Sequence, residues 1–452
     1  MAFFKVSKFF LLISVLSVVL VGTMTLFPFI VTKYTFFRMA IDFSAIFFLL
    51  GYIFRTSLFE SAYKERIRRV VRSPLFIALA VFVFFFVLSS FFAYDPQYAI
   101  WSNFERGEGA FQILHFFAFF FLLAVLFKEE SDWKNIFKLS IFAGGLMLLY
   151  GVLAGLGVKG FVGPAFSGGV RFQGSLGNAA YVGVYMLFVI FYLAYLSSRT
   201  AAKKIGYGVL MCVAAIFVWL TQTRGPVYGL GAGILAFLIY TLAKSGWKWK
   251  KQIFAFFAVC VVLGGGLVYF HDTPFVRSLP GARLFNIGFS SSSWQSRLWT
   301  WGSAVKGFEE RPLLGWGPEN FVVVFDKYFD TRHYVPAGGS ETWYDRAHSV
   351  YLDYLVETGI FGFLAFVSIF VAYYVQFVKR NKELDALQEK NKSERNKRIF
   401  ERGLFFALPI AYLMQGVVLF DILPTYINLF LFFSFAVWKF QLSSGEQAKR
   451  TK

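Results

Sequence analysis

Long apolar runs separated by short polar segments cover most of the chain, and this pattern predicts membrane-spanning helices. A spanning helix needs about 20 mostly apolar residues. Twelve such runs occur, at 9–31, 36–54, 75–94, 109–127, 136–157, 179–197, 205–221, 225–243, 252–270, 358–378, 403–421 and 424–440. The first run is too long for the core of a signal peptide and lacks a small-residue cleavage site, so we expect it to be a retained helix. The fold predicted is an all-α polytopic membrane protein with about 12 transmembrane helices.

One long segment, residues 271–347, interrupts this pattern between the ninth and tenth runs. Its composition resembles that of a soluble protein, and connections of this length usually carry function or are disordered. Because it contains Trp294, Trp301, Trp316 and Trp343, we expect short helices rather than disorder. The predicted organisation is helices 1–9 in residues 1–270, this loop at 271–347, helices 10–12 in 348–440 and a tail at 441–452.

The composition of the chain supports a membrane protein and excludes several other classes. Hydrophobic residues make up 57% of the chain and charged residues 16%. A soluble domain has roughly 25% charged residues. Soluble enzymes, disordered chains and fibrous proteins are therefore excluded, and two cysteines are too few for a disulfide scaffold.

The distribution of the basic residues predicts the orientation of the helices. With the N-terminus inside, 31 of the 45 Lys and Arg residues fall inside and 14 outside, eight of these in the long loop. The short outer connections therefore carry few basic residues, as the positive-inside rule requires. We expect both termini in the cytoplasm and residues 271–347 outside. The net charge of +19 is explained by basic loops facing anionic lipid headgroups, without a nucleic-acid partner.

Polar motifs occur in the segments that this orientation places outside. Residues 290–308 have helical spacing, with Arg297 and Trp301 on one face. RPLLGWGPENF then supplies Pro312, Gly315 and Gly317, which we expect to end that helix and form a turn. In RAHSVYLDYLVETGIFG, His348, Tyr351, Leu352 and Leu355 are expected on one helical face leading into the tenth span.

Two further outer segments place an arginine beside an apolar helix. Arg224 lies in TQTRGPVYG between the seventh and eighth spans, and Arg171 begins RFQGSLGN before the sixth. Arg224 is either an anchor at the membrane interface or an anion ligand facing a cavity, since ionisable residues at membrane depth usually face a site. For Arg171 the alternative to a ligand is an ordinary glycine-rich turn.

Taken together and in this order, the motifs resemble those of the O-antigen ligase and O-antigen polymerase family of bacterial envelope glycosyltransferases. The resemblance rests on TRG at a tight outer turn, Arg297 with Trp301, RPLLGWG, and Ala-His before YLDYLVETGIFG, and it covers about residues 165 to 375. RFQGSLGN is also similar to a segment of that family, and YDPQYAIWSNFERGEG is similar less specifically. One departure is Ser349, where the family commonly has Asn.

The resemblance implies a GT-C-like enzyme of the bacterial cytoplasmic (inner) membrane that uses an undecaprenyl-diphosphate-linked glycan as donor. An O-antigen ligase of lipopolysaccharide biosynthesis transfers the glycan to lipid A-core, a polysaccharide polymerase to another lipid-linked chain, and a protein O-oligosaccharyltransferase to a protein hydroxyl. The three activities share this chemistry, and we expect the middle of the outer loop, 321–344, to choose the acceptor. We expect the ligase-like activity, with no cofactor.

The same resemblance assigns roles to individual residues. Arg224 and Arg297 would hold the diphosphate, with Arg171 as a third candidate, because arginine remains cationic and binds phosphate oxygens bidentately. His348 would act on the acceptor hydroxyl as a base or as an orienting group, since its ordinary pKa suits proton transfer near neutral pH. Trp301 and Tyr351 would contact substrate.

Three other hypotheses remain open. A transporter would also have about twelve spans, but it predicts charges in the middle of broken helices. The charged pair in the second run, Arg38 and Asp42, lies near its outer end and is expected to pair locally. An assembly scaffold would not depend on the arginines or His348. A divalent metal would need acids, and Asp95, Glu105 and Glu108 in the first outer loop match no defined metal motif, so we expect no metal site.

Overall fold

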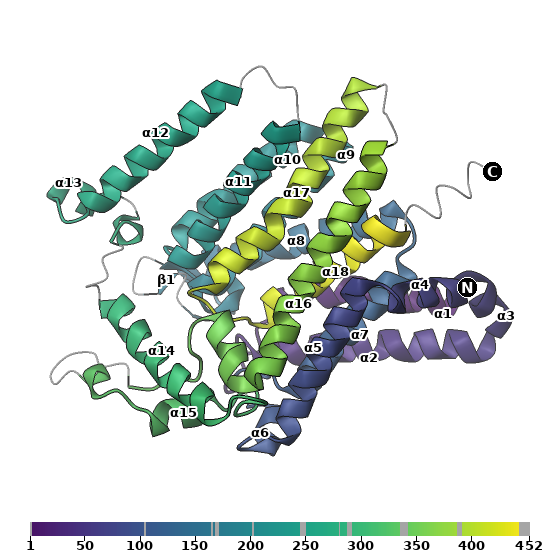
Figure 1. Ribbon diagram of the computed structural model, residues 1–452, viewed down its shortest axis with the longest axis horizontal. Coiled ribbons are helices and arrows are strands. Elements are labelled where there is room, and N and C mark those ends of the chain that lie inside the picture. The colour runs from purple at the N-terminus through teal and green to yellow at the C-terminus, as the bar shows by residue number, and fades with distance from the viewer. Residues whose placement is uncertain are drawn as a thin grey trace.

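The computed structural model shows an almost entirely helical protein (Figure 1). It describes residues 2–103, 105–163, 166–167, 171–200, 203–244, 250–279, 281–286, 292–334, 342–386 and 391–442. The strands described are β1 (Phe166–Ser167) and β2 (Arg171–Phe172), which pair antiparallel with Phe166 opposite Phe172. The predicted all-α class is therefore confirmed.

A helix lies at each of the twelve apolar runs. In chain order they are α1 (Ala2–Ser14) with η1 (Val15–Val19), α2 (Val31–Phe54), α5 (Pro74–Phe91), α7 (Ala110–Leu126), α8 (Glu130–Gly155), α9 (Ala179–Arg199), α10 (Lys204–Leu220), α11 (Arg224–Lys244), α12 (Lys250–Tyr269), α16 (Val350–Ala386), α17 (Lys392–Gly416) and α18 (Leu423–Val437) with η7 (Trp438–Leu442). Within the described residues, eight helices are long and apolar enough to cross a membrane, while α7 and α10 are shorter apolar helices. The chain is thus a polytopic membrane protein.

Several helix boundaries differ from the predicted ones, and two of these bear on the site. The first helix ends at Val19, because residues 20–30 form a turn in which the Gly22 amide donates to the Pro28 carbonyl at 2.9 Å. The tenth begins at Val350 and is broken at Gly359, whose φ is +65°. His348 precedes this helix and has a φ of +58°, so the prediction that it shares a helical face with Tyr351 is wrong.

Helices α9 and α18 form the centre of the bundle, and 89% of the apolar window of each is buried. The Tyr192 hydroxyl of α9 donates to Asn428 of α18 at 2.8 Å, which satisfies two polar groups inside the core. Polar contacts of this kind link helices in a membrane, where burial of apolar surface supplies little attraction between them.

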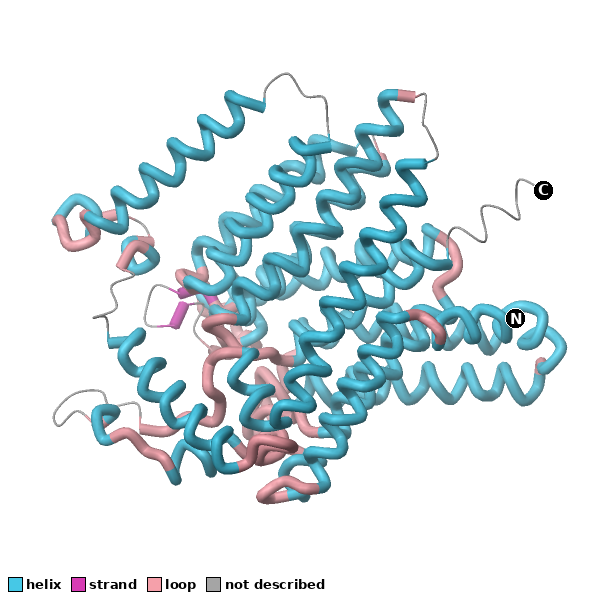
Figure 2. The backbone as a smooth tube through the Cα atoms, viewed as in Figure 1, coloured by secondary structure: helices cyan, strands magenta, loops and turns pink. Residues whose placement is uncertain are grey.

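The helices are joined by short elements on both sides. One connection contains α3 (Thr56–Phe59), η2 (Glu60–Lys64) and α4 (Glu65–Val71). The connections predicted to lie outside contain α6 (Pro96–Trp101), η3 (Gly174–Leu176), α13 (Pro274–Arg277), η5 (Ala282–Leu284), α14 (Ser292–Glu310), α15 (Phe321–Lys327) and η6 (Thr331–His333). Figure 2 shows many of the loop segments gathered together near the two strands.

The long loop folds as predicted, as short helices with a core of their own. Trp316, Phe321 and Phe325 are buried there together with Ala304 and Tyr344. This core packs α14 and α15 against the start of α16.

Candidate functional site

A cavity of about 520 Å³ lies where the outer connections meet. Its lining comes from all six connections that the sequence places outside, and includes 27–30, 105–106, 171, 176–178, 223, 297, 343–345, 348, 419–420 and 422. Residues of the adjoining end of α9 complete the wall. Segments far apart in the sequence therefore converge on one site, and Arg171, Arg297 and His348 of the predicted set are all among its lining residues.

Arg171 faces this cavity from β2 without a described carboxylate partner. Its guanidinium donates to the Thr221 carbonyl at 3.3 Å and to the Thr223 hydroxyl at 3.0 Å, both uncharged acceptors. Burial, together with the positive charge of Arg283, lowers the pKa of Arg171. A bound anion would oppose both effects, so the surroundings of Arg171 favour an anionic ligand.

His348 enters the cavity from the last turn before α16. Its Nδ1 lies 3.1 Å from the Arg346 carbonyl oxygen, which can only accept, so Nδ1 carries the proton and Nε2 is the basic nitrogen. Its ring packs against the rings of Tyr344 and Phe420 at 5.3 and 5.1 Å. The left-handed backbone of His348 is costly for a residue with a side chain and persists only when its neighbours hold it.

Asp345 and Ala347, which precede His348, are each held by contacts with other residues. Asp345 accepts two hydrogen bonds from Arg106, at 2.6 and 3.0 Å. The Ala347 amide donates to Asp353 at 2.6 Å, and the Ala347 carbonyl accepts from the Trp301 indole at 2.9 Å. These contacts fix the backbone that presents His348 to the cavity.

Arg106 lines the cavity as well, although sequence reasoning did not identify it. Besides the pair with Asp345 it donates to the Tyr181 hydroxyl at 2.8 Å and packs on the Phe420 ring at 5.2 Å. Burial acts to raise the pKa of Asp345, but the hydrogen bond and charge of Arg106 outweigh it and lower that pKa. The pair is thus ionised, and it joins the connection between α5 and α7 to the loop before His348.

The RPLLGWG turn has a structural role that explains its glycines. The break at Gly359 releases two carbonyls of α16, and these accept from the amides of Trp316 at 2.9 Å and Gly317 at 2.8 Å. A Cβ on Gly315 would lie 2.4 Å from the Val356 carbonyl oxygen, and one on Gly359 would lie 2.2 Å from that of Leu313. The turn and the broken helix therefore fit only with glycine at both positions.

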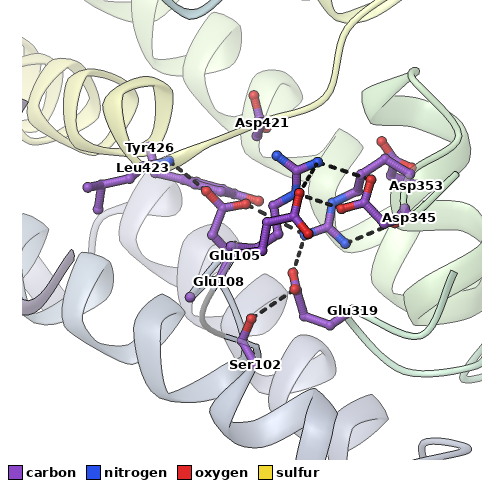
Figure 3. Close-up of polar contacts among 12 residues, drawn as sticks. Ser102, Glu105, Glu108, Glu319, Asp345, Asp353, Asp421, Leu423 and Tyr426 are labelled. Carbon is purple, nitrogen blue, oxygen red and sulfur yellow. Dashed lines mark hydrogen bonds and ion pairs between the residues drawn. The ribbon is translucent and has the colours of Figure 1, made fainter. Parts of the chain in front are cut away.

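Behind the cavity wall lies a buried group of charges, which we call the acidic cluster: Arg346 with Glu108, Glu319, Asp353, Glu357 and Asp421. Each of these side chains is less than 10% exposed. Arg346 forms a very short ion pair with Glu319 and pairs with Glu357 at 3.1 Å and Glu108 at 3.6 Å. Figure 3 shows Glu108, Glu319 and Asp353 approaching one another from separate segments, with Glu319 reaching Ser102 on one side and Glu108 reaching Leu423 on the other.

One arginine cannot neutralise five buried carboxylates, and the pKa values of Glu108 and Asp421 are raised. Burial raises the pKa of Glu108 to about 8, although the charge of Arg346 opposes the shift. Burial likewise raises the pKa of Asp421 to about 6, against hydrogen bonds from Tyr412 and Tyr354. The enclosed space beside these groups is only about 20 Å³, enough for one water molecule.

The other three predicted site residues do not line the cavity. Arg224 donates to the backbone carbonyls of Arg283 and Asn286 and, at 3.5 Å, to the Ser293 hydroxyl. Trp301 holds the Ala347 carbonyl, and the Tyr351 hydroxyl donates to the Leu413 carbonyl at 2.8 Å.

The acids considered for a metal lie in different places. Asp95 caps α6 through the Tyr98 amide at 3.0 Å, Glu105 lines the cavity, and Glu108 belongs to the acidic cluster. Among the described side chains, no group of three or more His, Cys, Asp or Glu could hold a metal ion. Whether the activity needs a metal stays a prediction.

The charges in the second span do not pair with each other as predicted. Arg38 donates to Gln112 at 2.5 Å and to the Gly107 carbonyl at 2.7 Å, while Asp42 lies 3.1 Å from His115. Both charged side chains therefore pair with α7 and the residues before it, and not with each other.

This fold and cavity define a multi-pass membrane protein with a polar, arginine-containing site at one end of its helix bundle. Residues 209–367 match the sequence profile of the family described as O-Antigen ligase. The chain therefore contains a domain of the O-antigen ligase family, which confirms the resemblance found in the sequence. The matched residues include Arg224, Arg297 and His348, whereas Arg171 lies outside them. A comparison with curated proteins finds no match.

Proposed function

We propose that the protein transfers a glycan from an undecaprenyl-diphosphate carrier to an acceptor hydroxyl, as an O-antigen ligase-like enzyme. The observation that carries this proposal is the cavity itself, where two arginines and a histidine from motifs far apart in the chain meet. The match to the O-antigen ligase family supports the same conclusion.

The proposal includes a location and an orientation. The twelve helices are taken to span the bacterial cytoplasmic membrane in a GT-C-like arrangement, with both termini in the cytoplasm. The cavity then opens on the extracytoplasmic side, where a flipped lipid-linked glycan is available. Supporting this, the short connections that line the cavity carry few basic residues.

Arg171 and Arg297 are proposed to hold the diphosphate of the donor. As the bond between the anomeric carbon and the diphosphate oxygen breaks, the electron pair leaves with the diphosphate and its charge grows. Cationic donors aimed at that charge lower the barrier, typically by several kcal/mol. Arg224 is a further candidate ligand, which would exchange the carbonyl oxygens of Arg283 and Asn286 for phosphate oxygens.

His348 is proposed to take the proton of the acceptor hydroxyl on Nε2 while the acceptor oxygen bonds to the anomeric carbon. The hydrogen bond from Nδ1 to the Arg346 carbonyl supports this role, because it leaves the basic nitrogen on the other side of the ring. Asp345, Arg346 and Ala347 act as positioning residues, since they hold the backbone of His348.

The acceptor is proposed to enter past Trp343 and Tyr344, which line the cavity at the end of the segment predicted to choose it. Residues 335–341 of that segment lie outside the described residues. Trp301 is proposed to act through position, because it holds the carbonyl of the residue before His348, whereas Tyr351 lies outside the cavity.

The experiment is transfer by the purified protein in nanodiscs with a short undecaprenyl-diphosphate glycan, with products identified by mass spectrometry. Lipid A-core, a pilin-like protein and the donor itself are offered as acceptors, and the His348→Ala protein is assayed in parallel. We expect a product with lipid A-core. Longer lipid-linked chains would indicate a polymerase, and glycosylated protein a protein O-oligosaccharyltransferase. No product with any acceptor, or equal products from both proteins, would contradict the proposal.

A further inference from the structure

A second, larger space lies between α16 and α17, away from the cavity. This groove has a volume of about 880 Å³ and an almost wholly apolar lining, including Phe366, Phe370, Val371, Val375 and Leu413. It runs along α16 from Tyr351 to Lys382. None of its lining residues lines the cavity.

Two hydrogen bonds join the helices α16 and α17 along the groove. The Tyr351 hydroxyl donates to the Leu413 carbonyl at 2.8 Å, and the Tyr374 hydroxyl donates to the Phe406 carbonyl at 3.0 Å. Both hydroxyls are thus satisfied inside the protein. The wall between them needs no water, which makes the groove suitable for a hydrocarbon chain.

The groove ends in two positive charges. Val371, Val375, Val378 and Lys382 are spaced four, three and four residues apart, so they form one stripe along α16. The three valines are 57%, 58% and 49% exposed. Lys379 and Lys382 also line the groove, and neither pairs with a carboxylate of the described residues, although Arg380 beside them pairs with Glu383 at 3.1 Å. An apolar stripe ending in unpaired lysines matches a chain with an anionic head.

We propose that the groove between α16 and α17 binds a phospholipid with an anionic headgroup, its acyl chain lying along the valine stripe and its phosphate on Lys379 and Lys382. Basic residues at the end of a groove between membrane helices are suited to such headgroups. The site is independent of glycan transfer, so it stands or falls separately from the proposed function.

The donor lipid is a poorer fit to the lysines than a phospholipid. Its charge is the diphosphate, proposed to bind in the cavity beside His348. From Gly359 to Lys379 the helix alone advances about 30 Å, so a diphosphate in the cavity cannot reach either lysine. The two lysines need an anion at their own end of α16, which is the end predicted to face the cytoplasm.

The test is native mass spectrometry of the purified full chain in detergent, titrated with phosphatidylglycerol or phosphatidylcholine. We expect phosphatidylglycerol to bind more tightly, and the Lys379→Gln/Lys382→Gln protein to lose about 30-fold in its affinity, from the usual contribution of two lysines near a membrane surface. The matched control is Lys203→Gln/Lys204→Gln at the start of α10, which leaves the groove unchanged. Val375→Trp, which fills the groove, should weaken both lipids.

Equal affinity for the two lipids would overturn the proposal, as would an unchanged phosphatidylglycerol affinity in the double glutamine variant. A third titration uses undecaprenyl phosphate. The contrary result is that undecaprenyl phosphate displaces phosphatidylglycerol, loses affinity in Val375→Trp and keeps its affinity in the double glutamine variant. That result would mean that the groove holds the tail of the donor, and the proposal would be wrong.

Discussion

Two polar regions lie on opposite sides of Phe420, and they differ in almost every physical respect. Phe420 lines both the cavity of about 520 Å³ and the enclosed space of about 20 Å³ in the acidic cluster. On the cavity side, the hydrogen bonds of Arg171 to described residues go to uncharged oxygens. On the cluster side, Arg346 is surrounded by carboxylates and its pKa is raised well above its usual value, because those charges outweigh burial.

The difference separates charges that bind a ligand from charges that hold the protein together. A buried charge needs partners, and removing one partner of a buried pair is strongly destabilising. In the acidic cluster Arg346 is the shared partner of Glu108, Glu319 and Glu357, and the cluster leaves no room for substrate. The cavity has room for substrate and an arginine whose surroundings favour an anion. We therefore assign chemistry to the cavity and support of the His348 backbone to the cluster.

The largest expected effect is on turnover, from His348→Ala. If Nε2 accepts the acceptor proton, kcat should fall by ~10²–10⁴. Thermal stability and donor binding should change little, because the ring lines an open cavity. His271→Ala is the matched control, since His271 lies in the same loop outside the cavity. Turnover within a few-fold of the natural protein would remove the base assignment.

Arg346→Met should act on stability rather than on chemistry. Loss of the cation leaves Glu319, Glu357 and Glu108 without their shared partner, at a cost of about 3–5 kcal/mol of folding free energy. Thermal unfolding in detergent measures the loss. Arg332→Met is the control, because its partner Asp330 forms a pair at the surface and little change is expected. Equal unfolding temperatures for the two variants would erase the contrast between the regions.

The pKa of Glu108 predicts how stability depends on pH. Folded Glu108 keeps its proton up to about pH 8, whereas the unfolded chain releases it near pH 4.5. The stability from this group is present in full below pH 4.5 and is lost as pH rises to about 8. Asp421 acts in the same direction only up to about pH 6. The unfolding temperature should therefore fall between pH 6 and 8, and fall less in Glu108→Gln. Parallel curves for the two proteins would show that Glu108 does not titrate in this window.

The smallest expected effect is that of Trp301→Phe. It removes the indole hydrogen bond to the Ala347 carbonyl, worth about 0.5–1.5 kcal/mol, and keeps the aromatic packing. Because that carbonyl precedes His348, we expect kcat to fall a few-fold, with KM for the donor unchanged. A rise in KM alone would mean that Trp301 touches the substrate directly.

The positions of the helices were predictable because each spanning helix is encoded locally, by its own apolar run. Arg171, Arg297 and His348 could also be identified from the sequence, because each lies in a short local motif. The partners of these residues were not predictable, since Arg106 and Asp345 are 239 residues apart and nothing in either segment encodes the pairing. One signal was present: Asp353 and Glu357 are acids at the start of a spanning helix, where a charge is costly unless it is paired.

The conformation of His348 was missed for a related reason. The spacing of apolar residues after it continues the helical pattern, so the sequence favours a helix that includes it. The contacts that prevent this come from elsewhere: Trp301 lies in α14 and Arg106 between α5 and α7. Tertiary contacts thus override the local pattern at the residue on which the proposed chemistry depends.

The central claim, that the open cavity is the anion-binding region, is tested most directly by the affinity for undecaprenyl diphosphate. It is measured by native mass spectrometry on the natural protein and on Arg171→Ala/Arg297→Ala. We predict a loss of at least about 100-fold, since hydrogen bonds to charged groups contribute about 1.5–3 kcal/mol each and two arginines are removed. Arg332→Ala at the surface should bind as the natural protein does. Unchanged affinity in the double variant would contradict this claim and would mean that the diphosphate binds elsewhere in the molecule.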